Sequence, residues 1–171
     1  AGGVESMTRV PMGLPATLPY KNGFGSYMSP AMKRRYPGVQ FSQFAGAEQL
    51  AVKYNLSKDA LDEYAFVSHC RAAAATREGR FTDEIVPVAV RDAEGNETGA
   101  VHAADEGIRF DATREGIAAV RLLAEGGRIS AASASQICDG AAMLLVANER
   151  GLKALGASPL AIVRQMTVIG H

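Results

Sequence analysis

The chain has 171 residues, 47% hydrophobic and 21% charged, an ordinary globular composition that excludes a disordered or fibrous protein. Its 18 basic residues balance 18 acidic ones, so no net field favours nucleic acid or an anionic membrane as a partner. Cys70 and Cys138 form no metal-ligand spacing, and no apolar run approaches the roughly 20 residues of a membrane helix. We expect a cytoplasmic protein with reduced thiols and no metal.

The first third of the chain predicts a strand end followed by a long loop. Residues 1–8 are expected to finish a strand, since Gly2 and Gly3 permit a sharp turn. The proline- and glycine-rich stretch from Thr8 to Pro37 shows little periodicity, which predicts a long irregular excursion. Its basic triplet, residues 33–35, is interpreted as a solvated turn, with a phosphate contact as the alternative.

Two helices are expected next. One covers residues 46–54, and a longer one begins after the N-cap Ser57 and ends near Glu78, before Gly79. We expect the longer helix to bury one alanine-rich face, made of Leu61, Tyr64, Ala65, Ser68, Ala72 and Ala75. His69 and Cys70 are neighbours on this helix and cannot face each other, so both are interpreted as structural.

The same two signals, hydrophobic periodicity and the glycine, proline and polar residues that end an element, predict the remaining elements. They are an edge strand over 84–90 that contains Pro87, a short returning strand near Val101, a short helix within 105–120, a surface helix over 148–155, and a strand over 159–168. The final residues, Gly170 and His171, are expected in a loop.

The stretch from Arg128 to Ala147, RISAASASQICDGAAMLLVA, organises the chain. Its small side chains between Ile129 and Gln136 would let a ligand lie along exposed peptide groups. Asp139 and Gly140 fit a turn or helix cap, and the uncharged run from Ala141 to Ala147 predicts a buried strand. A plain succession of strand, turn and strand, with Ser135 solvated, is the alternative.

Four ordered blocks of sequence resemble the thiolase family. ISAASASQICDGAAMLLVA resembles the family segment T-A-G-N-A-S-G-x-N-D-G-A-A and its following strand, and AGGVESM resembles A-G-G-x-E-S-M. The other two blocks are DEGIR over 105–109, followed by Thr113 and Arg121, and residues 79–87. Because the chain starts inside a motif, we expect it to be a piece of a longer protein.

The resemblance implies an α/β, thiolase-like layered fold that is present only in part. Residues 1–8 would end a strand of the N-terminal core domain, and residues 9–127 would form the helical loop (insertion) domain. Residues 128–158 would return to the N-terminal core, and residues 159–171 would start the C-terminal core domain.

The resemblance also implies acyl transfer between a cysteine and coenzyme A, which would be a co-substrate and not a bound cofactor. The family's nucleophilic Cys, its His and its second Cys are not matched, so we expect this piece alone to be inactive. Arg109 should contact the adenine of coenzyme A, while Ala131, Ala132 and Ser135 should contact its pantetheine arm. Neither Cys138, at a position usually Asn, nor His171 is interpreted as catalytic.

Departures from the family pattern bear on the substrate. The family's Pro-Ala-Phe is replaced by Leu122, Leu123 and Ala124, so one of the two leucines must wall the pantetheine tunnel, or the pocket is wider. The forms FSQFAGAE and ASQICDGAA resemble thiolases that act on bulky or steroid-derived acyl-CoA. A non-catalytic acyl-CoA-binding protein and an oligomer-assembly module are the alternatives, and we expect a homo-oligomer at full length.

Overall fold

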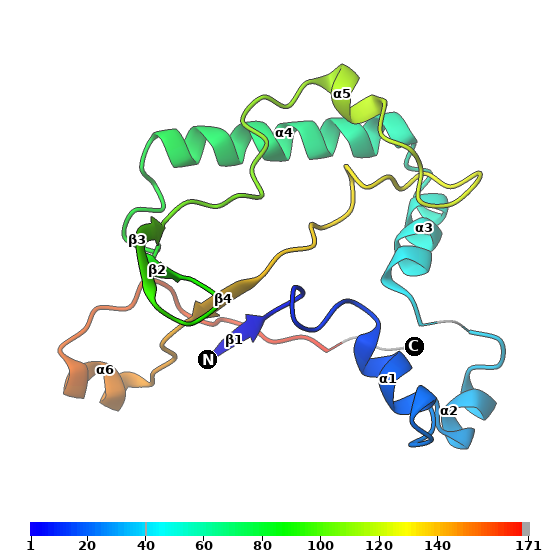
Figure 1. The fold of residues 1–171 in the computed structure, drawn as a ribbon, viewed down its shortest axis with the longest axis horizontal. Coiled ribbons are helices and arrows are strands. Elements are labelled where there is room, and N and C mark those ends of the chain that lie inside the picture. The colour runs from blue at the N-terminus through cyan, green and yellow to red at the C-terminus, as the bar shows by residue number, and fades with distance from the viewer. Residues whose placement is uncertain (40, 169–171) are drawn as a thin grey trace. The chain divides into compact units, whose positions relative to one another are not determined.

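The computed structural model describes residues 1–39 and 41–168, and the expected terminal loop at Gly170 and His171 lies outside them. The chain divides into two compact units. Figure 1 labels the helices and strands that they contain. The first unit combines Ala1–Met12 with the chain from Asp139 onward, and the second comprises Gly13–Cys138. Helices and two small antiparallel sheets give the described residues a mixed α/β content.

The first unit is built on a pair of strands, as expected for its beginning. β1 (Gly2–Glu5) runs antiparallel to β4 (Gly140–Met143), with Gly2 opposite Met143. A Cβ at Gly2 would lie 2.8 Å from the Ala142 carbonyl oxygen, so only glycine allows this approach. Asp139 accepts the Thr8 N–H at 2.9 Å and so closes the turn after β1, instead of capping a helix as one of its two expected roles required.

The C-terminal part of this unit corrects two predictions and confirms one. The run after Asp139 is not buried, because β4 ends at Met143 and the apolar side chains that follow are open to solvent. Residues 159–168 form no strand, since no other described segment pairs with them. The surface helix is confirmed as α6 (Glu149–Leu155), capped by Asn148 and ended by Gly156 at φ +62°.

The second unit opens with two short helices where a long loop was expected. They are α1 (Leu14–Lys21) and α2 (Pro30–Arg35). The prediction was wrong because prolines were read as helix breakers, whereas both helices carry one in their first turn, where its missing N–H costs no helical hydrogen bond. The basic triplet of residues 33–35 forms the exposed last turn of α2.

The two longer helices of this unit start at serine caps. Ser42 precedes α3 (Gln43–Lys53), which begins three residues before the expected start at position 46. Ser57 precedes α4 (Lys58–Arg77), as expected, and accepts the Ala60 N–H at 3.1 Å. The buried face of α4 differs from the predicted one, because Tyr64 is 78% exposed whereas Asp62 is 6% exposed. The prediction missed this face because it was based on hydrophobic residues, and Asp62 is charged.

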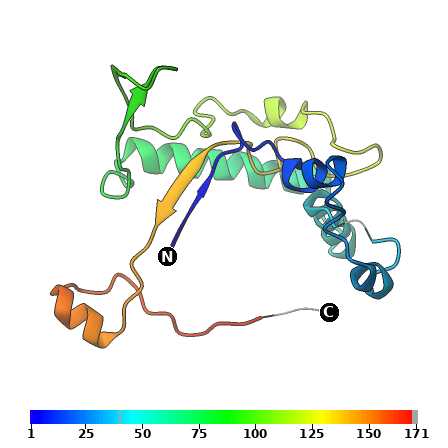
Figure 2. The ribbon, with the colours of Figure 1, turned by 60° about the horizontal axis from the view of Figure 1, so that its bottom comes forward.

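A hairpin and a short helix complete the second unit. β2 (Val88–Arg91) pairs with β3 (Glu97–His102), so the strand starts after Pro87 and does not contain it. A proline cannot donate a ladder hydrogen bond, which explains the later start. α5 (Arg114–Ala118) follows, and Figures 1 and 2 both show the segment that carries it running along α4.

Candidate functional site

The loop from Ser130 to Gln136 is folded by its own serines. Ser130 is fully buried, its N–H donates to the Ser133 hydroxyl at 3.0 Å, and its hydroxyl accepts the Ala132 N–H at 3.2 Å. The Ser130 carbonyl accepts the Ala134 N–H at 3.0 Å. Several peptide donors expected to be free for a ligand are therefore used to hold the turn, and small side chains let it close this tightly.

The remainder of the loop is accessible. Ala131 and Ser135 are exposed and Ala132 is half-buried, so the loop is not sealed beneath its neighbours. The Ser135 hydroxyl makes no hydrogen bond to any residue within 1–39 or 41–168. A hydroxyl in this state can donate to and accept from a ligand.

The start of the loop is anchored on α3. Glu48 Oε1 accepts the N–H groups of Arg128 and Ile129, both at 2.7 Å. The Arg128 guanidinium donates to the carbonyl oxygens of Ala51 at 3.0 Å and Leu56 at 2.6 Å. Each charge is thereby satisfied by backbone groups of the other segment, which fixes the loop against the helix.

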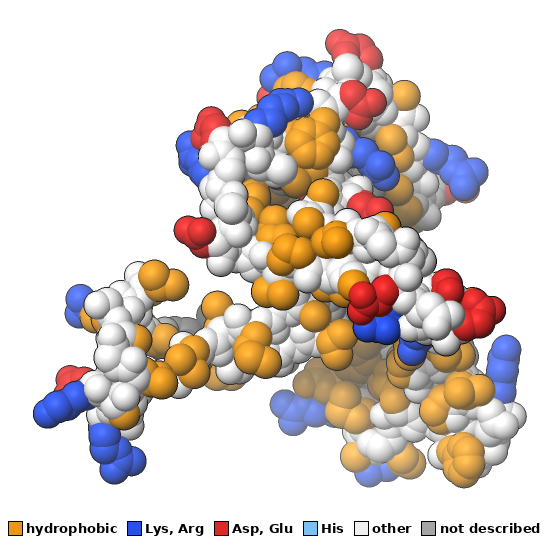
Figure 3. All heavy atoms as spheres, turned by 60° about the vertical axis from the view of Figure 1, so that its left-hand side comes forward, with side chains coloured by type: hydrophobic (Ala, Val, Ile, Leu, Met, Phe, Trp, Pro, Cys, Tyr) orange, Lys and Arg blue, Asp and Glu red, His pale blue; other side chains and the backbone are white. Residues whose placement is uncertain are grey.

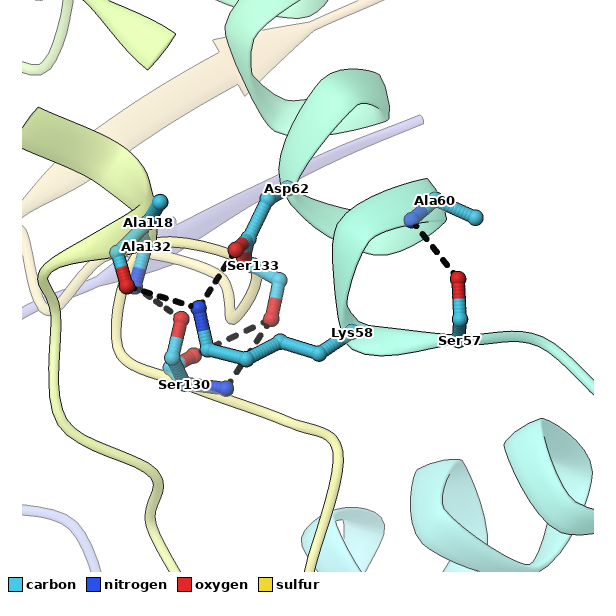
Figure 4. A network of polar contacts seen from close by, with 8 residues as sticks. All are labelled: Ser57, Lys58, Ala60, Asp62, Ala118, Ser130, Ala132 and Ser133. Carbon is cyan, nitrogen blue, oxygen red and sulfur yellow. Dashed lines mark hydrogen bonds and ion pairs between the residues drawn. The ribbon is translucent and has the colours of Figure 1, made fainter. Parts of the chain in front are cut away.

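A second group of polar contacts joins the first turn of α4 to α5. Figure 4 shows the Lys58 ammonium donating to the Asp62 carboxylate and to the Ala118 carbonyl oxygen, the latter at 3.0 Å. These bonds join the start of α4 to the end of α5. The other carboxylate oxygen of Asp62, Oδ1, is buried and has no hydrogen-bond partner among the described residues.

The segment from Gly107 to Phe110 is held in place at both ends. Gln136 donates its side-chain N–H to the Gly107 carbonyl oxygen, so this segment touches the end of the serine-rich loop. Arg77 on α4 donates to the Phe110 carbonyl oxygen at 3.5 Å and lies 5.3 Å from the centre of the Phe110 ring. Between these contacts, His69 Nδ1 on α4 accepts the Arg109 N–H at 3.2 Å.

The Arg109 side chain itself is unengaged. It is exposed, and its guanidinium makes no hydrogen bond, ion pair or ring contact with another residue in the described ranges. A surface ion pair with Asp105, Glu106 or Asp111 was the alternative to ligand binding, and none of these pairs forms. A held backbone with a free planar cation suits stacking on a ligand ring.

A cleft of 210 Å³ lies between α4 and α5, lined by Asp59, Asp62, Glu63, Arg114 and Ala118. Its main charges are paired: Arg114 donates to Glu63 through Nε at 2.6 Å and Nη2 at 2.8 Å, and these bonds lower the pKa of Glu63. The Arg114 guanidinium also lies 4.2 Å from the centre of the Phe66 ring. This arrangement holds α5 on α4.

The structure thus brings the sequence-predicted residues Arg109 and Ser135 into connected segments of one unit. The supporting residues Glu48, His69, Arg77 and Gln136 were missed as parts of the site. The i, i+4 and i+8 spacing of His69, Ala73 and Arg77 on α4 is the one signal that could have shown a shared helix face. Gln136 and Glu48 act across 29 and 80 positions of sequence, respectively, and carry no local signal.

The remaining candidates lie apart from these contacts. Cys70 and Cys138 are free and exposed. Within 1–39 and 41–168, no three potential metal ligands come together. Over the same residues, no helix is both long enough and apolar enough to span a bilayer.

Comparison with known proteins gives consistent matches. A family model described as "Thiolase, N-terminal domain" matches residues 1–150. The steroid 3-ketoacyl-CoA thiolase FadA6 of Mycobacterium tuberculosis is 38% identical over 169 residues, which are 98% of this chain and 40% of that protein. The 3-ketoacyl-CoA thiolases of Yersinia pestis and Bacillus subtilis are 37% and 36% identical over 99% of this chain. The chain spans about 40% of the length of the curated relatives it matches.

Proposed function

Because this chain belongs to the thiolase family, as its four motifs predicted, we propose that it is the coenzyme A-holding part of a thiolase-type acyltransferase. The complete protein would transfer an acyl group between a cysteine and coenzyme A, in 3-ketoacyl-CoA thiolysis or the reverse condensation. We propose coenzyme A as a co-substrate, with Arg109 on its adenine and Ala131, Ala132 and Ser135 along its pantetheine arm.

One contact carries this proposal. The hydrogen bond from the Gln136 amide to the Gly107 carbonyl oxygen joins the serine-rich loop to the segment of Arg109. An elongated ligand with an aromatic base at one end and a polar flexible arm needs both groups within one continuous surface. The free guanidinium of Arg109 and the free hydroxyl of Ser135 supply the two kinds of contact.

The serine-rich loop does not offer all of its peptide groups to the pantetheine arm. Since the Ala132 N–H is bonded to the Ser130 hydroxyl, the groups left for the arm at Ala132 are its methyl and its carbonyl oxygen. Leu122, half-buried, forms an isolated bridge with Ser130, and Leu123 beside it is 47% exposed. We propose Leu123 as the apolar wall that replaces the family's phenylalanine.

The proposed substrate class is a bulky or steroid-derived 3-ketoacyl-CoA. Its support is the 38% identical relative whose name specifies steroid 3-ketoacyl-CoA, together with the two departing motifs. Comparison of kcat/KM for a steroid-derived and a straight-chain 3-ketoacyl-CoA tests this part. A preference of the complete enzyme for the straight chain would refute it and leave the acyltransferase proposal intact.

We propose the family's domain plan for this chain. Residues 1–8 and 128–158 belong to the N-terminal layered core, 9–127 form the loop domain, and 159–171 start the C-terminal core. The catalytic Cys, His and second Cys, homo-oligomeric assembly and a cytoplasmic location are assigned by family to the complete protein.

A spectrophotometric thiolysis assay of the complete protein tests the function. We expect turnover of a 3-ketoacyl-CoA that requires added coenzyme A and stops when the family's nucleophilic cysteine is replaced by alanine. The 171-residue chain alone should show none. Coenzyme A binding by the complete protein without any turnover would support the non-catalytic alternative.

A further inference from the structure

We propose that His69 is a positioning residue for Arg109, and this inference rests on the adenine contact in the proposed function. His69 lies in the interior of α4, a helix of 20 residues, and is half-buried. Its Nδ1 accepts the peptide N–H of Arg109, 40 positions away, at 3.2 Å. The imidazole therefore contacts the very residue whose side chain is to meet the ligand.

The bond defines the state of the imidazole. A ring nitrogen that accepts a hydrogen bond carries no proton, so the neutral ring holds its proton on Nε2. His69 therefore meets Arg109 as a neutral acceptor and adds no second positive charge beside its guanidinium. The contact fixes the peptide and leaves the charged end of the arginine free.

The segment needs such support because it has no secondary structure of its own. Residues 108 and 109 belong to no helix or strand, and the contacts of Gln136 and Arg77 hold the neighbouring residues Gly107 and Phe110. His69 supplies the bond to the Arg109 peptide itself. A fixed Cα reduces the conformational freedom that the arginine loses when it stacks on a ring, so the bond should improve affinity without touching the ligand.

Isothermal titration of the complete protein with coenzyme A and with pantetheine, which lacks the adenine nucleotide, tests this role. His69→Asn keeps an acceptor near the place of Nδ1, whereas His69→Leu has a similar size and no acceptor. We expect His69→Leu to weaken coenzyme A binding about fivefold, because the Arg109 segment must then lose more conformational freedom on binding, and His69→Asn to bind like the wild type. Pantetheine should bind all three proteins equally.

A merely structural histidine would give a different pattern. If His69→Leu weakens pantetheine as much as coenzyme A, or leaves both unchanged, the positioning role is wrong. In an Arg109→Ala background we expect His69→Leu to have no further effect on coenzyme A, and a full additional effect would also refute the role.

Two controls keep the test decisive. If His69→Leu does not fold, His69→Gln replaces it, because its amide reaches the place of Nε2 and not that of Nδ1. Equal coenzyme A affinity of His69→Gln and His69→Asn would then overturn the proposal. Should Arg109→Ala alone leave coenzyme A affinity unchanged, the adenine contact fails independently of His69.

Discussion

At the scale of single residues, the site separates side chains that hold the backbone from side chains left free. His69, Arg77 and Gln136 bind peptide groups of the Gly107–Phe110 segment. Arg109 and Ser135 have no bonded partner for their side chains among the described residues. Substitution of the free side chains should therefore change binding with little effect on folding.

Arg109→Ala should weaken coenzyme A binding about twofold to fivefold, the range for losing a stacked cation at an exposed site. Titration of the complete protein measures this, and Arg71→Ala is a matched control because Arg71 is exposed elsewhere on α4. We expect the melting temperature to stay the same. An unchanged dissociation constant in Arg109→Ala would contradict the stacking role.

Ser135→Ala should cost about 1 kcal/mol of coenzyme A binding, the net value of one hydrogen bond. The same loss should appear with pantetheine, since Ser135 is assigned to the arm and not to the adenine. Ser68→Ala, on the exposed side of α4, is the control. If Ser135→Ala binds both ligands as tightly as Ser68→Ala and the wild type do, Ser135 makes no ligand contact and the loop has only a structural role.

Asp139 links stability to pH in the β1–β4 unit. The N–H of Thr8, with help from the Ser6 hydroxyl, lowers the pKa of Asp139 in the folded state. A lowered folded pKa means that the stabilisation is complete above the unfolded value, about 3.9, and is lost as pH falls through the folded value. Asp139→Asn should therefore lower the melting temperature at pH 7, with a difference that shrinks toward pH 2.

Thermal unfolding of both proteins across this range measures the effect, with Asp83→Asn as a control on an exposed carboxylate. A difference between wild type and Asp139→Asn that is the same at pH 7 and pH 2 would show that the carboxylate charge is not involved.

At the scale of elements, α4 is the support on which the site is built. Residues 109–118 run antiparallel along it, from the contact of Arg109 with His69 to that of Ala118 with Lys58. Stability of α4 should therefore matter to every part of the site in the second unit. Its N-cap offers a clean test.

Ser57→Ala should destabilise the fold by about 1 kcal/mol, because the Ala60 N–H loses its cap. Urea unfolding should show a lower midpoint with an unchanged slope. Ser68→Ala makes the same chemical change inside the helix and should be neutral or slightly stabilising, since alanine is the better helix former. Equal midpoints for the two variants would refute the capping role.

Local signals predicted several elements well. The cap at Ser57, the stop at Gly79 and the α6 helix between Asn148 and Gly156 depend on residues within one turn of the helix end. Pro87 was correctly read as weakening the strand, but the strand was predicted to contain it, whereas β2 begins one residue after it. Signals read from single residues failed where a residue type fits two structures, as with the prolines in the first turns of α1 and α2.

The site was predictable only in part for the same reason. Arg109 and Ser135 could be singled out because a family motif surrounds each of them. His69 and Gln136 could not, because their role depends on which distant peptide groups they meet. The expectation of bare peptide in the loop failed for the Ala132 N–H, since hydroxyls within the loop compete for the same donors.

At the scale of the whole molecule, the described residues leave much apolar surface uncovered (Figure 3). Val4, Met143 and Leu145 on or beside the β1–β4 pair are each more than three-quarters exposed. A two-stranded sheet is at best marginally stable alone. The relatives are more than twice as long as the chain, and we propose that their additional length covers this surface in the complete protein.

The 171-residue chain alone should therefore bind the dye ANS and self-associate on a sizing column, whereas the complete protein should do neither as strongly. Leu145→Lys in the isolated chain should reduce both effects, and Arg71→Lys should not. A monomeric isolated chain that binds no dye would refute the proposed cover.

Hydrogen–deuterium exchange of the complete protein, with and without coenzyme A, tests the central claim most directly. The account predicts that the ligand slows exchange in both 107–110 and 131–136. In Arg109→Ala, the ligand should protect 107–110 less than in the wild type, with a smaller change in 131–136. Protection confined to other segments, or to one of these two alone in the wild type, would contradict a continuous coenzyme A surface formed by the two segments.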